Sequence, residues 1–359
     1  MILTKHVQVR TSGRLGRVTL DRPEAINALT QSMIEEIGFT LELLAEDPGI
    51  ATVVLDGVGE RGFCAGGDVV ALRGSALKDG AAARRFWRAE YRLNARIASF
   101  PKPIVAIMDG IVMGGGVGLA CHAAHRVATE TLVWAMPEVT IGFAPDVGGT
   151  YLLSRLPGEL GTWIALTAQR LDAATAQGVG LVDRIVARDD LDDLLERLAI
   201  EDVGTVLGAG ERGTTAASLD RTRRWVDSRF AGDDAAAIER RLAAEGDVEA
   251  RAALRALRKG SPTSVAVTLS AMRIARRLPS LEQCLEQEYR TSCSFLAVED
   301  FCEGIRAALV DKDRRPRWQP SSLDRVDDAL VERILSGPGD VEPLFDDAGR
   351  EGSVSWTSA

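Results

Sequence analysis

Two glycine-rich stretches of this chain each follow a short apolar run, and together they could hold an oxygen that gains negative charge. One spans residues 63–68, after the apolar run 51–56, and the other spans residues 110–118, after the run 103–109. Backbone N–H groups in such loops can point at one spot, and the dipole of a following helix adds positive potential. Two converging loops would form an oxyanion hole, the usual device for stabilising charge on a thioester oxygen. The alternative is two tight turns in which glycine supplies a positive φ.

Three carboxylates in apolar surroundings are the next candidates. Glu138 follows a Met-Pro pair, and Asp146 lies between a proline and two glycines further along. Poorly solvated carboxylates can do acid–base or nucleophilic work, because desolvation and mutual repulsion shift their pKa values. Both could instead cap loops, the commoner role of Asp and Glu in turns. Glu90 lies on an apolar-rich helical stretch, where a solvated helix face beside an arginine is the simpler interpretation.

Other catalytic and cofactor patterns fail on spacing. Residues 114–118 are similar to a dinucleotide fingerprint, but its third glycine would have to be Leu119 or Cys121. His122 and His125 have no third ligand at a spacing typical of a metal site, so we expect no metal. The chain has no G-x-S-x-G serine motif, which argues against an α/β-hydrolase thioesterase.

Strands and helices alternate over the first half of the chain, which predicts an α/β architecture with parallel strands. A strand–loop–helix unit recurs at residues 51–75 and 103–125, as in turns of a repeated ββα spiral. Thr30 is the expected cap of the first helix. The expected elements are a hairpin at 7–20, helices at 30–47, 81–99 and 119–125, buried strands at 51–56 and 103–109, and short strands at 126–129 and 132–135.

The character of the chain changes from about residue 190. Residues 201–216, rich in glycine and threonine, predict a linker, and the last residues from 336 are rich in Gly, Asp and Ser, as in a mobile tail. Further helices are expected at 235–257, 262–277 and 281–309. We therefore divide the chain into a core with the site (1–200), an all-helical region (201–335) and a tail (336–359).

Bulk composition excludes several classes of function. The net charge of −9 over 359 residues argues against non-specific nucleic-acid binding. Five cysteines without a C-x-x-C pair argue against a disulfide framework and favour a reducing cytoplasm. The N-terminus lacks the apolar core of a signal peptide, and no run of 18 apolar residues predicts a membrane span.

Three stretches of the chain resemble the signature motifs of a known family. Residues 21–29, 63–68 and 114–116 look like the three signature stretches of the crotonase (enoyl-CoA hydratase/isomerase) superfamily. The similarity runs from about residue 3 to about residue 325. The motifs that resemble its 3-hydroxyisobutyryl-CoA hydrolase branch lie at 90–94, 113–119, 136–149, 261–264, 288–290 and 311–313.

This resemblance implies a crotonase-like ββα spiral core with a C-terminal all-helical region, and hydrolysis of a short 3-hydroxyacyl-CoA thioester. The implied substrate is 3-hydroxyisobutyryl-CoA, as in valine breakdown, with no cofactor. In this resemblance Gly67 and Gly115 supply the oxyanion-hole amides, and Glu138 is the catalytic carboxylate. Asp146 lies across the acyl pocket, and Glu90 binds the 3-hydroxy group. The implied coenzyme A contacts are Ala25, Ile26, Asn27 and Ala65, with Gly67 beside them.

One departure separates this chain from the hydratases it resembles. The hydratases share a second active-site glutamate just after the Gly-Gly-Gly stretch. In this chain that position is Gly118. Two alternatives stay open: an enoyl-CoA hydratase or isomerase that uses Glu138 alone, and a non-catalytic acyl-CoA-binding protein. Homo-oligomers are common among crotonase relatives, so a homo-oligomer is possible.

Overall fold

The computed structural model describes residues 2–3, 5–208 and 216–345. Within these residues a seven-stranded sheet has the order β1-β2-β3-β4-β5-β7-β9, and β6 pairs with β8 in a second sheet. The first three strands pair antiparallel, and the pairs from β3 onward are parallel. The strands are β1 (Ile2–Leu3), β2 (Val7–Ser12), β3 (Leu15–Leu20), β4 (Thr52–Gly57), β5 (Ile104–Met108), β6 (Ile111–Met113), β7 (His125–Thr129), β8 (Val133–Ala135) and β9 (Arg184–Val186).

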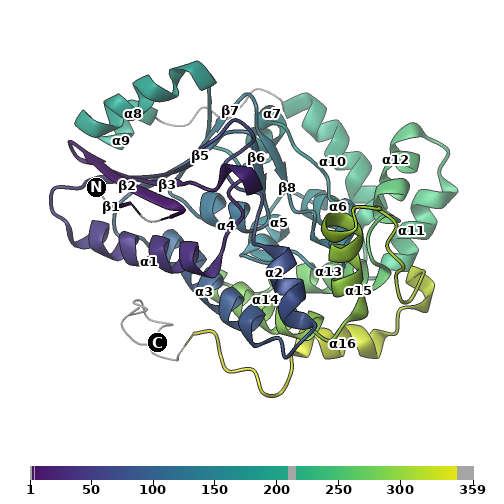
Figure 1. Cartoon of the computed structure of the whole chain (residues 1–359). Coiled ribbons are helices and arrows are strands. Elements are labelled where there is room, and N and C mark those ends of the chain that lie inside the picture. Colours follow the sequence, from purple (N-terminus) through teal and green to yellow (C-terminus); the bar gives the residue numbers. More distant parts are fainter. Residues whose placement is uncertain (1, 4, 209–215, 346–359) are drawn as a thin grey trace.

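Helices surround the sheet and make up the C-terminal part of the chain (Figure 1). Those up to residue 207 are α1 (Gln31–Glu46), α2 (Val69–Ala76), α3 (Ala81–Ala98), α4 (Gly115–Cys121), α5 (Gly149–Ser154), α6 (Leu160–Thr167), α7 (Ala173–Gly178), α8 (Leu191–Ile200) and α9 (Val203–Leu207). The later ones are α10 (Ala216–Phe230), α11 (Ala235–Ala244), α12 (Val248–Leu257), α13 (Pro262–Ala275), α14 (Leu281–Phe295), α15 (Glu299–Ile305) and α16 (Asp328–Ser336). A short 3-10 helix, η2 (Glu138–Ile141), follows β8.

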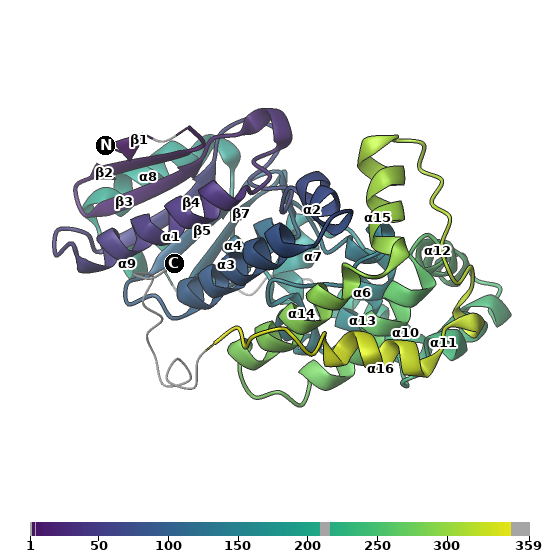
Figure 2. The same ribbon diagram turned by 60° about the horizontal axis from the view of Figure 1, so that its bottom comes forward.

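The large sheet is buried on both faces, which is typical of parallel strands. Successive residues of a strand point to opposite faces, so Val54 packs in a cluster with α8 and α9, whereas Val53 and Leu55 pack in the cluster that includes α1. Figures 1 and 2 show α8 with α9 and α1 on opposite sides of the sheet. The sheet is thus a rigid layer whose loops can hold a site.

The C-terminal helices pack against the core. Helix α14 contacts α3, and α13 contacts α5 and α6; in Figure 2 these helices lie together beside the sheet layer. A single buried hydrophobic cluster contains both Leu41 of α1 and Leu285 of α14. The division of the chain at residue 200 remains a prediction. No helix among the described residues is both long enough and apolar enough to span a bilayer.

Several expected elements differ from the structure. The helix expected at 281–309 is α14, α15 and a π-helix (Arg306–Val310), with a break at residues 296–298. The helix expected at 119–125 exists but lies earlier in the chain: α4 starts at Gly115, inside the stretch expected to be a loop, and ends at Cys121, and residue 125 begins β7. The helix expected at 235–257 is two helices, separated at residues 245–247, where Asp247 caps α12. The expected linker 201–216 contains α9, and its residues 209–215 lie outside the described part.

The described part of the expected tail, residues 336–345, lies against α3. Arg88 donates to the carbonyl oxygens of residues 342 and 343, and Arg92 donates to that of Leu344 at 2.9 Å. Leu344 is fully buried. The remaining residues of that prediction, 346–359, are outside the described residues.

Candidate active site

A cleft of about 490 Å³ lies between the two glycine-rich segments, the η2 turn and residues 301–309. It brings together Gly67, Gly115, Glu90, Glu138 and Asp146, which are far apart in the sequence. Its mouth and walls also include Arg22, Ala25, Ile26, Arg61, Ala65, Trp87, Phe143, Phe301, Ala308 and Leu309. Every predicted site residue except Asn27 therefore lines one cleft.

Asn27 has a different place. Its side chain is fully buried, and its Nδ2 donates to the carbonyl oxygens of Val58 and Phe63, each at 3.0 Å. Its Oδ1 accepts from the backbone N of Arg22 at 2.8 Å. The Asn27 side chain therefore fixes the turn that presents Ala25 and Ile26 to the cleft.

The amides of Gly67 and Gly115 lie next to each other. A Cβ built on Gly115 would be 3.3 Å from the N of Gly67, and one built on Gly66 would be 3.5 Å from the N of Gly115. Gly115 is the first residue of α4, so its N–H has no acceptor within the helix. Neither amide donates to a backbone acceptor within the described residues. The two donors are thus free for one ligand oxygen.

Glu90 lies against Gly115, so a side chain at position 115 would displace the Glu90 carboxyl. A Cβ there would be 2.3 Å from Oε1 of Glu90. The same applies at Gly118, where a Cβ would be 2.7 Å from Cβ of Val147 and 2.8 Å from Nδ2 of Asn94. No glutamate side chain fits at position 118 unless this packing is rebuilt.

Glu138 begins the η2 turn, and the C-terminal helices hold that turn. Its side chain is 4% exposed and its Oε2 has no partner among the described residues. The Oε1 would be 3.3 Å from a Cβ built on Gly114, which places the carboxyl beside the start of α4. The N of Ser261 donates to the carbonyl oxygen of Val139 at 2.9 Å, and the Ser261 hydroxyl donates to Asp300 at 2.5 Å.

Asp146 lies in a loop that α14 fixes from behind. Both oxygens of the Glu288 carboxylate accept hydrogen bonds, one from the N of Gly148 at 2.6 Å and one from the N of Thr150 at 2.9 Å. Val147 has a φ of +54°, an unusual conformation for a β-branched residue. Its carbonyl oxygen lies 2.8 Å from Nε2 of His122. The loop is therefore held in a strained form by contacts on two sides.

Burial of three acids in one cleft disfavours their charged forms. Burial, followed by the charges of Asp146 and Glu138, raises the pKa of Glu90 well above its ordinary value. Burial and the charge of Asp146 do the same to the pKa of Glu138. Burial raises the pKa of Asp146 to about 7, against a hydrogen bond from Tyr91 that lowers it. Such shifted carboxyls are typical of catalytic sites.

Sequence reasoning did not assign roles to several residues of this site. Tyr91, Ser292 and Glu288 support Asp146 and its loop, and Trp87, Phe143 and Phe301 form an aromatic wall, with Trp87 stacked on Phe143 at 5.5 Å between ring centroids. The available signals were weak: Tyr91 follows Glu90 on an apolar helix, and residues 288 and 292 are one helical turn apart. The residues that contact one another here are far apart in the sequence, so no local pattern could indicate these contacts.

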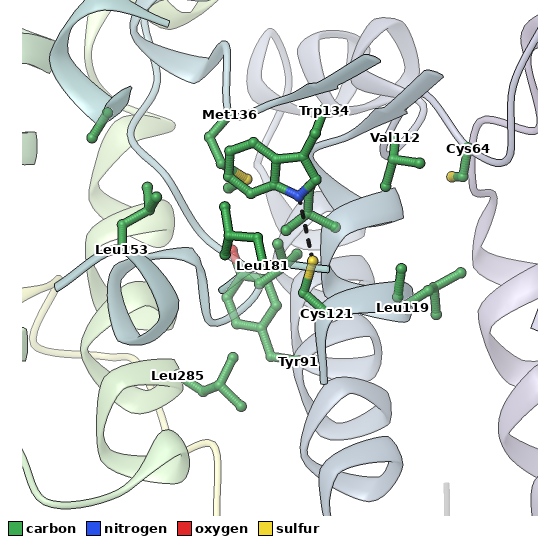
Figure 3. Packing of buried hydrophobic residues seen from close by; sticks show 14 of the residues in the cluster. Cys64, Tyr91, Val112, Leu119, Cys121, Trp134, Met136, Leu153, Leu181 and Leu285 are labelled. Carbon is green, nitrogen blue, oxygen red and sulfur yellow. Dashed lines mark hydrogen bonds between the residues drawn. The ribbon is translucent and has the colours of Figure 1, made fainter. Parts of the chain in front are cut away.

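Of the two histidines weighed as metal ligands, His122 has a structural contact, and so does the neighbouring Cys121. His122 bonds the carbonyl oxygen of Val147, and the Sγ of Cys121 accepts from Nε1 of Trp134 at 3.3 Å, a contact visible in Figure 3. The five cysteines are free thiols.

The chain belongs to the enoyl-CoA hydratase/isomerase family, whose model matches residues 15–335. It is 38% identical to the mitochondrial 3-hydroxyisobutyryl-CoA hydrolase of Xenopus laevis, over 91% of this chain and 88% of that one. It is 38% identical to 3-hydroxyisobutyryl-CoA hydrolase 1 of Arabidopsis thaliana, over 92% and 90%, and 36% identical to the mitochondrial 3-hydroxyisobutyryl-CoA hydrolase of Homo sapiens, over 95% and 91%.

Two solved structures share the fold over almost the whole chain. A carnitinyl-CoA dehydratase from Mycobacterium thermoresistibile is 46% identical with a TM-score of 0.90, covering 95% of this chain and 99% of that one. An enoyl-CoA hydratase from Rhodobacter sphaeroides is 42% identical with a TM-score of 0.87, covering 93% and 98%. The names of these relatives thus divide between thioester hydrolysis and hydration chemistry.

Proposed function

We propose that this protein hydrolyses 3-hydroxyisobutyryl-CoA to 3-hydroxyisobutyrate and free coenzyme A. The observation that carries the proposal is the meeting of two free amides, Gly67 and Gly115, with the carboxyl of Glu138 in one cleft, while packing excludes a second glutamate at position 118. The names of the curated relatives support the same reaction.

In this proposal the thioester carbonyl oxygen binds between the Gly67 and Gly115 amides. Attack on the carbonyl carbon turns that oxygen into an oxyanion, which the two N–H groups stabilise. Glu138 either attacks directly, giving a mixed anhydride that water then cleaves, or removes a proton from an attacking water. In both routes the C–S bond breaks, the sulfur leaves with coenzyme A and takes up a proton, and one water is consumed.

The walls of the cleft suit a short hydroxyacyl group. The aromatic wall of Trp87, Phe143 and Phe301 closes the apolar side. Glu90 and Asp146 supply the polar side, where the 3-hydroxyl of the substrate binds. Ala25, Ile26 and Ala65 line the path of coenzyme A, and Arg22 and Arg61 near them supply positive charge for its phosphates.

A panel of CoA thioesters tests the proposal: 3-hydroxyisobutyryl-, 3-hydroxypropionyl-, isobutyryl- and crotonyl-CoA, each followed by free-thiol release and by enoyl absorbance. We expect thiol release from the two hydroxyacyl thioesters and little change of crotonyl-CoA. Loss of enoyl absorbance without thiol release would favour a hydratase, the function named for the Rhodobacter sphaeroides structure. Binding of all four without turnover would favour an acyl-CoA-binding protein.

Three further expectations stay proposals. The protein works without a metal or other cofactor. Its oligomeric state stays open, with a homo-oligomer as one candidate. It acts in the cytoplasm, although the Xenopus laevis and human relatives are named mitochondrial.

A further inference from the structure

Tyr91 is a buried tyrosine of α3 whose hydroxyl does not take part in the proposed bond-breaking steps. Its side chain is 0% exposed, and its hydroxyl oxygen lies 2.7 Å from Oδ2 of Asp146 and 2.8 Å from Oγ of Ser292 on α14. Figure 3 draws Tyr91 in the buried cluster that also holds Leu285 of α14. The hydroxyl therefore reaches Asp146 from behind the cleft.

The chemistry of the three groups sets the direction of these hydrogen bonds. An ionised carboxylate can only accept, so Tyr91 must donate to a charged Asp146. The phenol oxygen then accepts the proton of Ser292, and every hydroxyl in the chain of bonds is used once as a donor. This contact is made to Oδ2 of Asp146.

Asp146 needs such a donor because its other titratable neighbours do not favour its charge. Glu90, Glu138 and Glu288 offer it no positive charge, and the charge of Asp146 raises the pKa of each of them. Burial lowers the pKa of His122 to about 4, so this histidine is neutral at physiological pH. Among the side chains of the described residues, the hydrogen bond to Asp146 comes from Tyr91, and the backbone of Asp146 itself supplies a second one that also lowers the pKa. The titratable groups that face Asp146 or its loop are Glu90 and Tyr91 from α3, Glu138 from η2, Glu288 from α14, and His122, the residue after α4.

We propose that Tyr91 is a positioning residue that holds Asp146 ionised and in one orientation during thioester hydrolysis, with Ser292 as the second link. The charged Asp146 then accepts a hydrogen bond from the substrate or the hydrolytic water. This inference rests on the proposed function, because it gives Asp146 a part in turnover. Burial alone would push the pKa of Asp146 still higher than about 7, and the Tyr91 hydroxyl opposes that rise.

The test is the pH dependence of kcat/KM for 3-hydroxyisobutyryl-CoA in the wild-type protein and in Tyr91→Phe, which removes the hydroxyl alone. A hydrogen bond donated to an ionised carboxylate stabilises the charged form and therefore lowers the pKa of the carboxyl. We expect the acidic limb of the kcat/KM profile of Tyr91→Phe to move to higher pH. On the acidic side of that limb kcat/KM should fall by about tenfold or more, whereas on the alkaline plateau it should stay near the wild-type value. Ser292→Ala should move the limb in the same direction by less.

Tyr289→Phe is the matched control. Tyr289 is also buried, and its ring packs edge-on against Tyr91 at 6.3 Å between centroids, but it makes no hydrogen bond to Asp146 among the described residues. Its pH profile should equal that of the wild type. Melting temperatures of all four proteins show whether a loss of activity reflects unfolding.

The outcomes separate the two hypotheses. A wild-type protein that releases no thiol removes the proposed function before any variant is compared. If the wild type is active, an unchanged limb in Tyr91→Phe, or an equal loss at every pH, would overturn the role of Tyr91 alone. A limb that moves to lower pH in Tyr91→Phe would also overturn the role of Tyr91. It would mean that Asp146 works in its protonated form, and that Glu138 ionises more easily when Asp146 is neutral.

Discussion

The carboxamide of Asn94 lies directly against the α-carbon of Gly118. A Cβ at position 118 would be 2.8 Å from Nδ2 of Asn94, and the other side of that space is filled by Val147. Asn94 is fully buried on α3, one turn after Glu90. Helices α3 and α4 therefore meet through glycines of α4, and this close contact determines which acids can reach the substrate.

Gly118→Ala tests this contact. The added Cβ would be too close to both neighbours, so we expect a destabilisation of about 1–3 kcal/mol, as in other overpacked cores. Gly74→Ala is the control: Gly74 is also helical, is exposed and has no atom within 4 Å of an added Cβ, so alanine there should stabilise by about 0.5–1 kcal/mol. Urea unfolding of both variants measures the difference, and equal effects would contradict the packing argument.

Glu138→Gln should make the protein more stable while it removes activity. The pKa of Glu138 is raised in the folded protein, so its contribution to stability is present below the ordinary glutamate pKa and is lost as pH rises through the raised value. Glutamine has no charge to bury. The melting temperature of the variant should therefore exceed that of the wild type by a few degrees at alkaline pH, with a smaller gap near pH 5.

The control for this experiment is Glu46→Gln, an exposed glutamate at the end of α1. Its melting temperature should follow that of the wild type at each pH. A stability gap for Glu138→Gln that does not change with pH would show that desolvation of this carboxyl is not the cause.

Phe143→Ala should lengthen the acyl chain that the protein accepts. Phe143 packs against Trp87, Phe295 and Phe301, and its removal opens the apolar end of the cleft. We expect the ratio of kcat/KM for 3-hydroxyhexanoyl-CoA to that for 3-hydroxyisobutyryl-CoA to rise by about 10-fold or more. Phe230→Ala removes an equally buried ring from α10 beside Trp225, away from the cleft, and should leave the ratio unchanged. A rise in both variants would mean that general loosening is responsible.

Ser261→Ala tests whether the C-terminal helices position Glu138. Ser261 caps α13 and also donates to Asp300 at 2.5 Å, next to the turn that begins with Glu138. Loss of this bond to a buried carboxylate should cost about 1–3 kcal/mol and lower kcat. Ser280→Ala removes only the cap of α14, for which about 1 kcal/mol and an unchanged kcat are expected. An unchanged kcat in Ser261→Ala as well would argue that the turn does not depend on these helices.

Local patterns in the sequence predicted the parts of the fold that depend on near neighbours. Thr30 is the helix cap that was expected, and it accepts a hydrogen bond from the N of Met33. The hairpin of β2 and β3 and the parallel strands β4 and β5 were also predicted. The cleft residues were predicted largely from the resemblance, since glycines and carboxylates alone left the simpler interpretations open.

Contacts between distant residues were beyond reach. The start of α4 was missed because a run of glycines is typical of a loop, yet here packing overrides propensity: a Cβ on Gly116 would be 2.3 Å from the carbonyl oxygen of Cys64. The support of Asp146 by Ser292, and of its loop by Glu288, comes from a helix well over a hundred residues later in the chain. No spacing in the sequence indicates such a pairing.

The rate of free-thiol release from saturating 3-hydroxyisobutyryl-CoA, measured for the wild type and for Glu138→Gln, is the most direct test of the proposed reaction. We predict steady turnover by the wild type and a rate lower by about 10²–10⁴-fold or more in the folded variant. Equal rates in the two proteins would mean that the carboxyl beside the paired glycine amides does not take part in cleaving the thioester.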